Sequence, residues 1–174
     1  MQLRIAVTYS DDLLGRLGRW WGMTWTHAAL RYKPDAPGAS WRVIEATMAG
    51  IKERSWADFI ADKEGIQLYQ VKGGLPESTS REIVAYGWGN VGKRYAFWWL
   101  GRIAWRLFKQ RFPLGVMTYP SHVCSSLVYN CFLYGNLDLV PGHKGVLVTP
   151  DEIVSSSLLE EAPLQEARVR LARG

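Results

Sequence analysis

Cysteine and histidine are scarce in this chain, which has two cysteines and three histidines among 174 residues. No Cys-x-x-Cys or His-x-x-x-His spacing occurs, so the sequence gives no zinc-ligand pattern and we expect no metal site. Long apolar runs are missing as well, because Arg102 and Arg106 interrupt the most apolar stretch. A window of about 18 apolar residues, as a membrane-spanning helix requires, is therefore absent from the sequence.

Signals for export and for nucleotide binding are also lacking. The first residues form only a short apolar run before Asp11 and Asp12, too short for the core of a signal peptide. We therefore expect a cytoplasmic chain whose cysteines stay reduced. No Walker loop is present, and the glycines of GWGNVG at 87–92 follow no expected strand, so we expect no cofactor.

The composition is that of a folded domain, with 48% hydrophobic and 21% charged residues and a net charge of +5. Runs rich in branched or aromatic residues and bounded by turn formers predict strands at 3–8, 25–32, 41–47, 66–71 and 145–148. Helical patterns occur at 80–86, 95–111 and 121–134. A last short helix begins at Thr149, with Pro150 at its first position and Glu152 as the capping-box partner.

This mixture of elements predicts an α+β fold in which an antiparallel sheet packs against helices. The length suits one domain. We assign residues 1–157 to that single domain and residues 158–174 to a charged C-terminal tail or peripheral helix.

Cys124 is the candidate nucleophile, because it lies just inside the start of the helical run HVCSSLVYNCFLYG. A thiol in the first turn of a helix faces unpaired N–H groups and the positive end of the helix dipole, which favours thiolate. Cys131 lies about 10 Å further along the same helix, too far for a disulfide. We therefore interpret Cys131 as a buried core thiol.

The candidate base is His27, in the first strand of an expected hairpin. If 25–32 and 41–47 pair around a turn centred on Ala36, opposed residue numbers sum to about 72, which places His27 opposite Glu45. A carboxylate beside an imidazole fixes its tautomer and stabilises its protonated form. A cross-strand salt bridge without catalytic meaning is the alternative interpretation of this pair.

Three short motifs in this order, WTHAALRY, WRVIEAT and HVCSSLV, resemble the circularly permuted NlpC-type papain-like hydrolases. That group includes the YiiX-like amidases and is related to lecithin:retinol acyltransferase. REIVAYGWGNVGKRY at 81–95 and VTPDEI near the end are similar to further family segments. The chain departs from the family pattern at two positions, Ala96 after the tyrosine and Ser126 in the cysteine motif.

The resemblance implies a permuted papain-like fold and a thiol hydrolase with Cys124 as nucleophile, His27 as base and Glu45 as the orienting carboxylate. The implied substrates are peptidoglycan-type peptide amides, or lipid amides and esters. A thiol acyltransferase acting on lipids and a non-enzymatic membrane-binding module are the alternatives. A murein enzyme in the cytoplasm needs an export or lysis partner, as in phage-derived systems.

The other two histidines compete less well for the role of base. His122 is two residues from Cys124, and side chains at that spacing on a helix point apart. We assign His122 to the helix start or the surface. His143 lies among the turn formers PGHKG and is expected to be a solvated loop residue.

The segment 93–112, KRYAFWWLGRIAWRLFKQRF, has no acidic residue and carries six basic residues, which leaves a net charge of −1 for the rest of the chain. Arg102, Arg106 and Lys109 share one helical face, opposite an apolar face. A surface helix packed on the core is one interpretation. An interfacial helix on an anionic membrane is the other, because basic residues flanked by tryptophans are typical of such helices. No nucleic-acid recognition module is visible.

Overall fold

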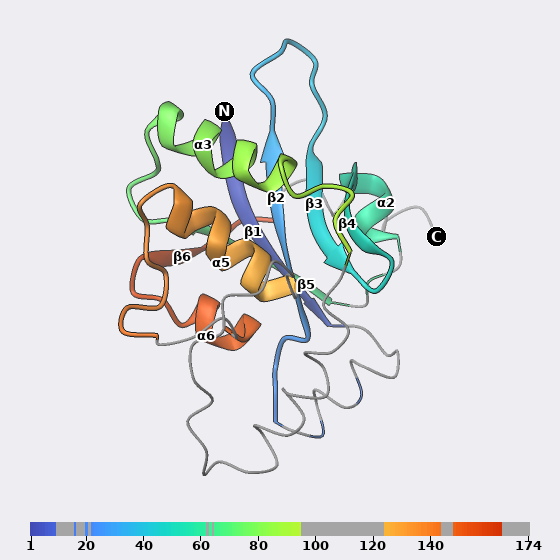
Figure 1. The fold of residues 1–174 in the computed structure, drawn as a ribbon, viewed down its shortest axis with the longest axis vertical. Coiled ribbons are helices and arrows are strands. Elements are labelled where there is room, and N and C mark those ends of the chain that lie inside the picture. The colour runs from blue at the N-terminus through green and yellow to red at the C-terminus, as the bar shows by residue number, and fades with distance from the viewer. Residues whose placement is uncertain are drawn as a thin grey trace.

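A computed structural model describes residues 1–9, 16, 20, 22–61, 63, 65–94, 124–143 and 148–164. Its centre is one antiparallel sheet with the strand order β4-β3-β2-β1-β5-β6 (Figure 1). The strands are β1 Gln2–Tyr9, β2 His27–Lys33, β3 Arg42–Thr47, β4 Gly50–Ser55, β5 Gly65–Val71 and β6 Leu159–Ala162. The first two form the centre of the sheet, and β4 and β6 form its edges.

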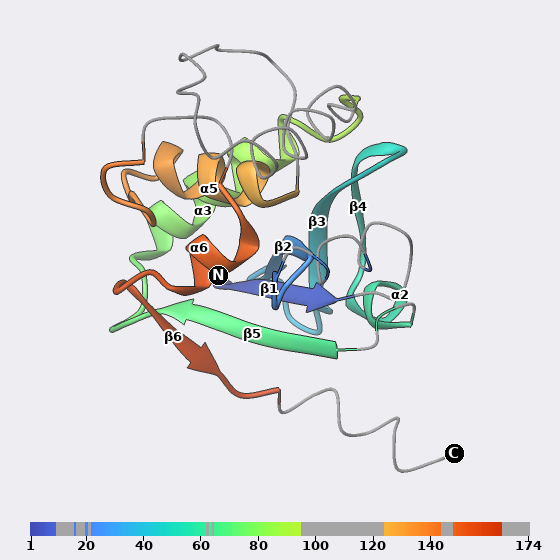
Figure 2. The same cartoon turned by 90° about the horizontal axis from the view of Figure 1, so that it is seen from below.

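The helices are α2 Trp56–Ile60, α3 Glu77–Trp88, α5 Cys124–Tyr134 and α6 Pro150–Val154. Figure 2 shows α3, α5 and α6 on the same side of the sheet, with α2 beside β4 at one edge. The predicted α+β class, an antiparallel sheet packed against helices, is confirmed. The predicted start of α6 is confirmed too, because Thr149 and Glu152 form a complete capping box.

Alternation along the strands divides the buried side chains into two clusters, one on each face of the sheet. The larger cluster joins one face to α3, α5 and α6 through residues such as Leu30, Ile83 and Leu127. The smaller cluster joins the other face to α2 through Ala29, Val43 and Phe59. The strands of the site therefore have a packed layer on both sides, which fixes their positions.

Three described elements differ from the sequence expectations. β4 and α2 were not predicted, although they follow β3 directly. Residues 159–162 lie in the segment expected to be a tail or peripheral helix, but they form β6, an edge strand paired with β5. Most of the expected strand at 145–148, the expected helix at 95–111 and residues 121–123 lie outside the described residues.

Candidate active site

The candidate site lies at the end of the β2–β3 ladder, beyond the pair Leu30 and Ile44. That ladder joins Leu30 to Ile44 and Tyr32 to Arg42, so opposed residue numbers sum to 74. The predicted sum of 72, with His27 directly opposite Glu45, is therefore wrong by two residues. A shift of two keeps every side chain on its predicted face, because side chains alternate with a period of two. The two residues remain diagonal neighbours on one face.

The imidazole of His27 and the carboxylate of Glu45 are in direct contact. Nε2 of His27 lies 2.8 Å from Oε2 of Glu45. The histidine side chain is 17% exposed and the carboxylate side chain 1%. The contact is thus a short, largely buried hydrogen bond rather than a solvated surface salt bridge.

Cys124 is the first residue of α5, the helix that packs across the larger core cluster. Its neighbour Ser125 is buried and donates a hydrogen bond to the Val148 carbonyl, which ties the first turn of α5 to the chain just before α6. The groups that act on the Cys124 thiol are the His27 side chain and the backbone of Ala28 and Ser125, all of which favour its ionised form. The structure therefore brings the three predicted residues together in the order Cys124, His27, Glu45.

Electrostatics at this site favour a thiolate beside an imidazolium. Burial alone lowers the pKa of His27, but hydrogen bonds and charge from Cys124 and then Glu45 outweigh it and raise that pKa to about 9. Burial opposes ionisation of Cys124, yet the His27 hydrogen bond, the His27 charge and the two backbone N–H groups hold its pKa below the usual thiol value. A charged pair of this kind is the reactive form of a cysteine nucleophile.

Glu45 is held ionised from two sides. Burial raises its pKa, but the His27 hydrogen bond and charge, followed by the charges of Arg54 and Lys52, bring it below the usual carboxyl range. Neither basic residue was predicted from the sequence. Lys52 and Arg54 alternate in KERS as residues on one face of a strand do, but three consecutive charged residues do not predict a strand.

The remaining cysteine and histidines have separate environments. Cys131 is fully buried, which confirms the prediction of a buried core thiol, and this burial raises its pKa to about 12. His143 lies in a loop, as predicted, but it is partly buried rather than solvated, and its ring stands edge-on to that of Tyr129 with centroids 6.2 Å apart. His122 lies outside the described residues.

No protein-family model and no curated protein sequence matches the chain. A search of solved structures finds a match over nearly the whole length of both chains. The fold resembles that of metalloprotein yiiX from Escherichia coli O157:H7. The TM-score is 0.69 and the identity 14%, over 92% of this chain and 94% of yiiX. The resemblance to YiiX-like proteins is thus confirmed for the fold.

Because yiiX is described as a metalloprotein, we tested whether the site residues here fit a metal ion. Cys124, His27 and Glu45 form a chain in which the imidazole stands between the thiol and the carboxylate, so the three donors do not converge on one point. Arg54 and Lys52 occupy the other side of the carboxylate. Within the described ranges, no group of three or more His, Cys, Asp or Glu residues is placed to hold a metal ion. These residues therefore do not fit a metal centre.

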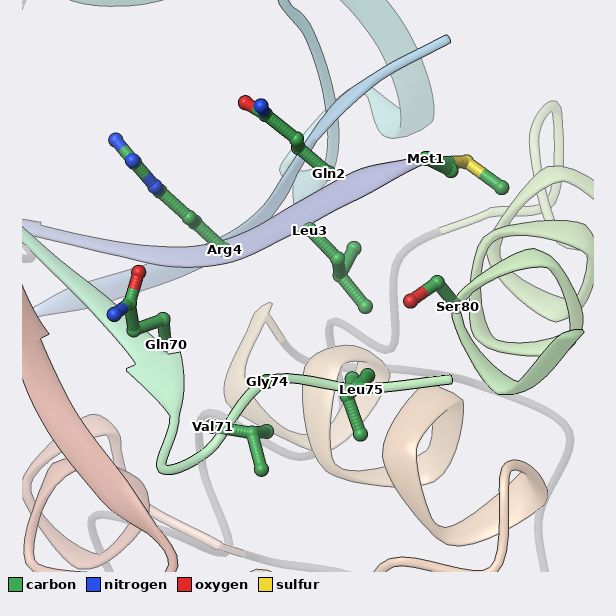
Figure 3. A pocket seen from close by; sticks show the side chains of 9 residues that line it. All are labelled: Met1, Gln2, Leu3, Arg4, Gln70, Val71, Gly74, Leu75 and Ser80. Carbon is green, nitrogen blue, oxygen red and sulfur yellow. The ribbon is translucent and has the colours of Figure 1, made fainter. Parts of the chain in front are cut away.

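A separate pocket of about 340 Å³ lies between the start of β1, the end of β5 and the start of α3 (Figure 3). Leu3, Gln70 and Ser80 are among its lining residues. The residue that pairs with His27 is Thr8, at the other end of β1. At about 3.3 Å per residue, the pocket is roughly 17 Å from the site along that strand. It is therefore not part of the candidate active site.

Proposed function

We propose that the chain is a thiol hydrolase of the permuted papain-like type that cleaves an amide bond. The observation that carries this proposal is the short His27–Glu45 hydrogen bond next to Cys124, at a site where surrounding groups favour the thiolate and the imidazolium. Its substrates are peptidoglycan-type peptide amides or lipid amides and esters. The YiiX-like fold also supports the proposal, because the three sequence motifs that contain these residues resemble the group that includes the YiiX-like amidases.

The proposed reaction has two steps. The Cys124 thiolate attacks the carbonyl carbon and forms a C–S bond, and the C–N bond breaks as the imidazolium of His27 gives its proton to the leaving amine. Water then attacks the thioester while the neutral imidazole takes up the proton of the water. Cleavage of the C–S bond releases the acid and restores the thiolate. The backbone N–H of Cys124 is a candidate donor to the oxyanion.

Glu45 takes no proton in this scheme. It accepts the hydrogen bond from Nε2 of His27, which fixes the orientation of the ring and stabilises the charge that the ring carries before amine departure. The burial of the carboxylate strengthens that interaction, since less water screens it.

Labelling with a panel of electrophiles tests the proposal. Peptide-amide and acyl-ester probes should modify Cys124 but not Cys131 in the full-length protein. The acyl group that reacts fastest identifies the class of substrate. Cys124→Ser should lose labelling while unfolding with the same cooperative transition. Failure of every probe to modify Cys124 at neutral pH, or equal modification of Cys131, would refute a nucleophilic role.

A lipid acyltransferase remains the second candidate for the same site. It shares the thioester step and differs only in the acceptor, an alcohol or amine in place of water. Product analysis with a labelled acyl donor separates the two: hydrolysis releases the free acid in the presence of an amine or alcohol acceptor, whereas transfer gives the acylated acceptor.

A further inference from the structure

Beyond the three predicted residues, the site extends one strand further, to Arg54 on β4. The β3–β4 ladder pairs Glu45 with Lys52 and Val43 with Arg54. Both basic side chains therefore stand on the same face as the carboxylate, one directly opposite and one diagonal to it. Nε of Arg54 lies 2.7 Å from Oε1 of Glu45, and Nζ of Lys52 lies 3.7 Å from the same oxygen.

The two basic residues differ in how firmly they are held. Arg54 is 17% exposed, whereas Lys52 is 48% exposed. The Arg54 guanidinium also donates from Nη1 to the carbonyl of Asp58 at 2.9 Å and lies 5.1 Å from the centre of the Phe59 ring. These contacts with α2 fix the guanidinium in place, while the Lys52 ammonium reaches the carboxylate from solvent.

The aromatic ring that supports Arg54 also contacts the histidine. Phe59 is fully buried, and its ring centre is 6.2 Å from that of His27. The five-residue helix α2 thus contacts both partners of the Glu45 carboxylate. Phe59 lies beside the imidazole of His27, and Phe59 and Asp58 lie beside the guanidinium of Arg54. The carboxylate shares one oxygen with each partner, Oε2 with His27 and Oε1 with Arg54.

We propose that Arg54 is a positioning residue for the nucleophile: by holding Oε1 of Glu45, its guanidinium keeps Oε2 on the imidazole, which in turn keeps the ring in place beside Cys124. This inference rests on the proposed thiol hydrolase. A carboxylate with a single partner rotates about its last side-chain bond, whereas one held at both oxygens does not. A guanidinium suits this task because one rigid, planar group places its charge against Oε1 of Glu45 in a close ion pair while Nη1 donates to the Asp58 carbonyl.

The charged groups that face Glu45 are His27 from β2 and Lys52 and Arg54 from β4, and Phe59 from α2 covers the imidazole with an apolar ring. Removing either basic residue takes one positive charge away from the same oxygen. A pair of variants, Arg54→Met and Lys52→Met, therefore separates loss of positioning from loss of charge.

The experiment uses the full-length protein with two probes, p-nitrophenyl acetate for turnover and iodoacetamide for thiolate reactivity at Cys124, measured by peptide mapping against Cys131. Arg54→Met should lower kcat by about tenfold to a hundredfold with KM within about twofold, because geometry at the reacting atoms is lost. Its iodoacetamide profile should move toward the ordinary thiol pKa of about 8.5. Lys52→Met removes the same charge but none of the contacts with α2, so it should lose clearly less than Arg54→Met in both measurements.

A folded Arg54→Met variant with wild-type kcat and an unchanged iodoacetamide profile would overturn the inference, as would equal losses in Arg54→Met and Lys52→Met. If Arg54→Met does not unfold cooperatively, Arg54→Lys decides: it keeps the charge but lacks the planar group, so a lowered kcat supports positioning and wild-type behaviour contradicts it. A wild-type Cys124 that reacts only as an ordinary thiol would instead refute the proposed function itself, whatever Arg54 does.

Discussion

His27 stands between a thiol and a carboxylate, and its two neighbours decide its charge. A buried imidazole without partners would be neutral at pH 7, because burial disfavours the cation. Here Cys124 and Glu45 reverse that outcome and raise the pKa of His27 to about 9. The ring therefore carries a proton at neutral pH, as the proposed acylation step requires.

The raised pKa of His27 sets the alkaline limb of activity. The imidazolium must be present to protonate the leaving amine, so kcat/KM for an amide substrate should fall as pH rises through about 9. On the acid side, activity should fall as the Cys124 thiolate is protonated, below the usual thiol pKa. A pH–rate profile measures both limbs. An alkaline limb near pH 6.5, the ordinary histidine value, would contradict this assignment.

Substituting His27 and Glu45 in turn should rank their contributions to kcat. His27→Ala removes the acid and base and should lower kcat by about a hundredfold to ten-thousandfold. Glu45→Gln keeps an acceptor for Nε2 and should leave measurable residual activity, because orientation contributes less than proton transfer. Steady-state kinetics with thermal unfolding as the folding control gives the ranking. A smaller loss for His27→Ala than for Glu45→Gln would reverse the two roles.

At the scale of elements, α6 holds the residues that immediately precede β2. Asp151 in its first turn accepts hydrogen bonds from the backbone N–H groups of Thr24 and Trp25, at 3.0 and 3.2 Å. Those residues lead directly into His27. A carboxylate at a helix start is also favoured by the helix dipole. One side chain near the end of the described chain thus fixes the segment that precedes the candidate base.

Removing that carboxylate should loosen the segment. Asp151→Ala leaves two backbone N–H groups without their partner and should lower the free energy of unfolding by about 1–3 kcal/mol. Urea denaturation measures the change, and Glu82→Ala on the exposed side of α3 is the control, expected to stay within about 0.5 kcal/mol of the wild type. Equal stability of Asp151→Ala and the control would show that the two hydrogen bonds do not hold this segment.

The elements themselves were partly predictable from the sequence. Strands β1, β2, β3 and β5 have branched or aromatic residues between turn formers, and the local capping signals of Thr149 and Glu152 fixed α6. β4 has three consecutive charged residues, Lys52, Glu53 and Arg54, so it lacks the composition of a strand and forms through pairing with β3. β6 likewise depends on pairing with β5, which is distant in sequence. Long-range pairing of this kind leaves no local signal.

The candidate site shows the same division. Because side chains alternate between the two faces of a sheet, His27 and Glu45 were correctly predicted to share one face. The register itself was wrong by two residues, since the assumed turn centre was wrong. Cys124 was predicted from its place at the start of a helical run, which α5 matches. Arg54 was missed because its contact with Glu45 depends on a strand that the sequence pattern did not reveal.

At the scale of the whole molecule, the charge of the basic segment 93–112 predicts contact with an anionic membrane. Within the described residues, no helix is long and apolar enough to cross a membrane. Residues 95–112 of the basic segment lie outside the described residues, so docking on an anionic surface stays a prediction from sequence. Each basic residue near an anionic bilayer contributes about 1 kcal/mol, and the attraction decays over about 8 Å at physiological salt.

Co-sedimentation with liposomes tests that prediction. Wild-type protein should bind vesicles with anionic lipid at low salt and release them as salt rises. Replacing Arg102, Arg106 and Lys109 with glutamine should abolish binding but spare turnover of a small soluble substrate, because none of the three belongs to the proposed triad of Cys124, His27 and Glu45. Absence of wild-type binding at low salt would leave the segment as an ordinary packing helix.

The proposed chemistry requires Cys124 to be a thiolate next to a protonated His27. The pH dependence of Cys124 alkylation measures the fraction of thiolate directly. We predict that iodoacetamide modifies Cys124 with an apparent pKa well below the ordinary thiol value of about 8.5, and that His27→Ala returns this pKa toward that value. A wild-type Cys124 that titrates at or above the ordinary value, or one that His27→Ala leaves unchanged, would contradict the account.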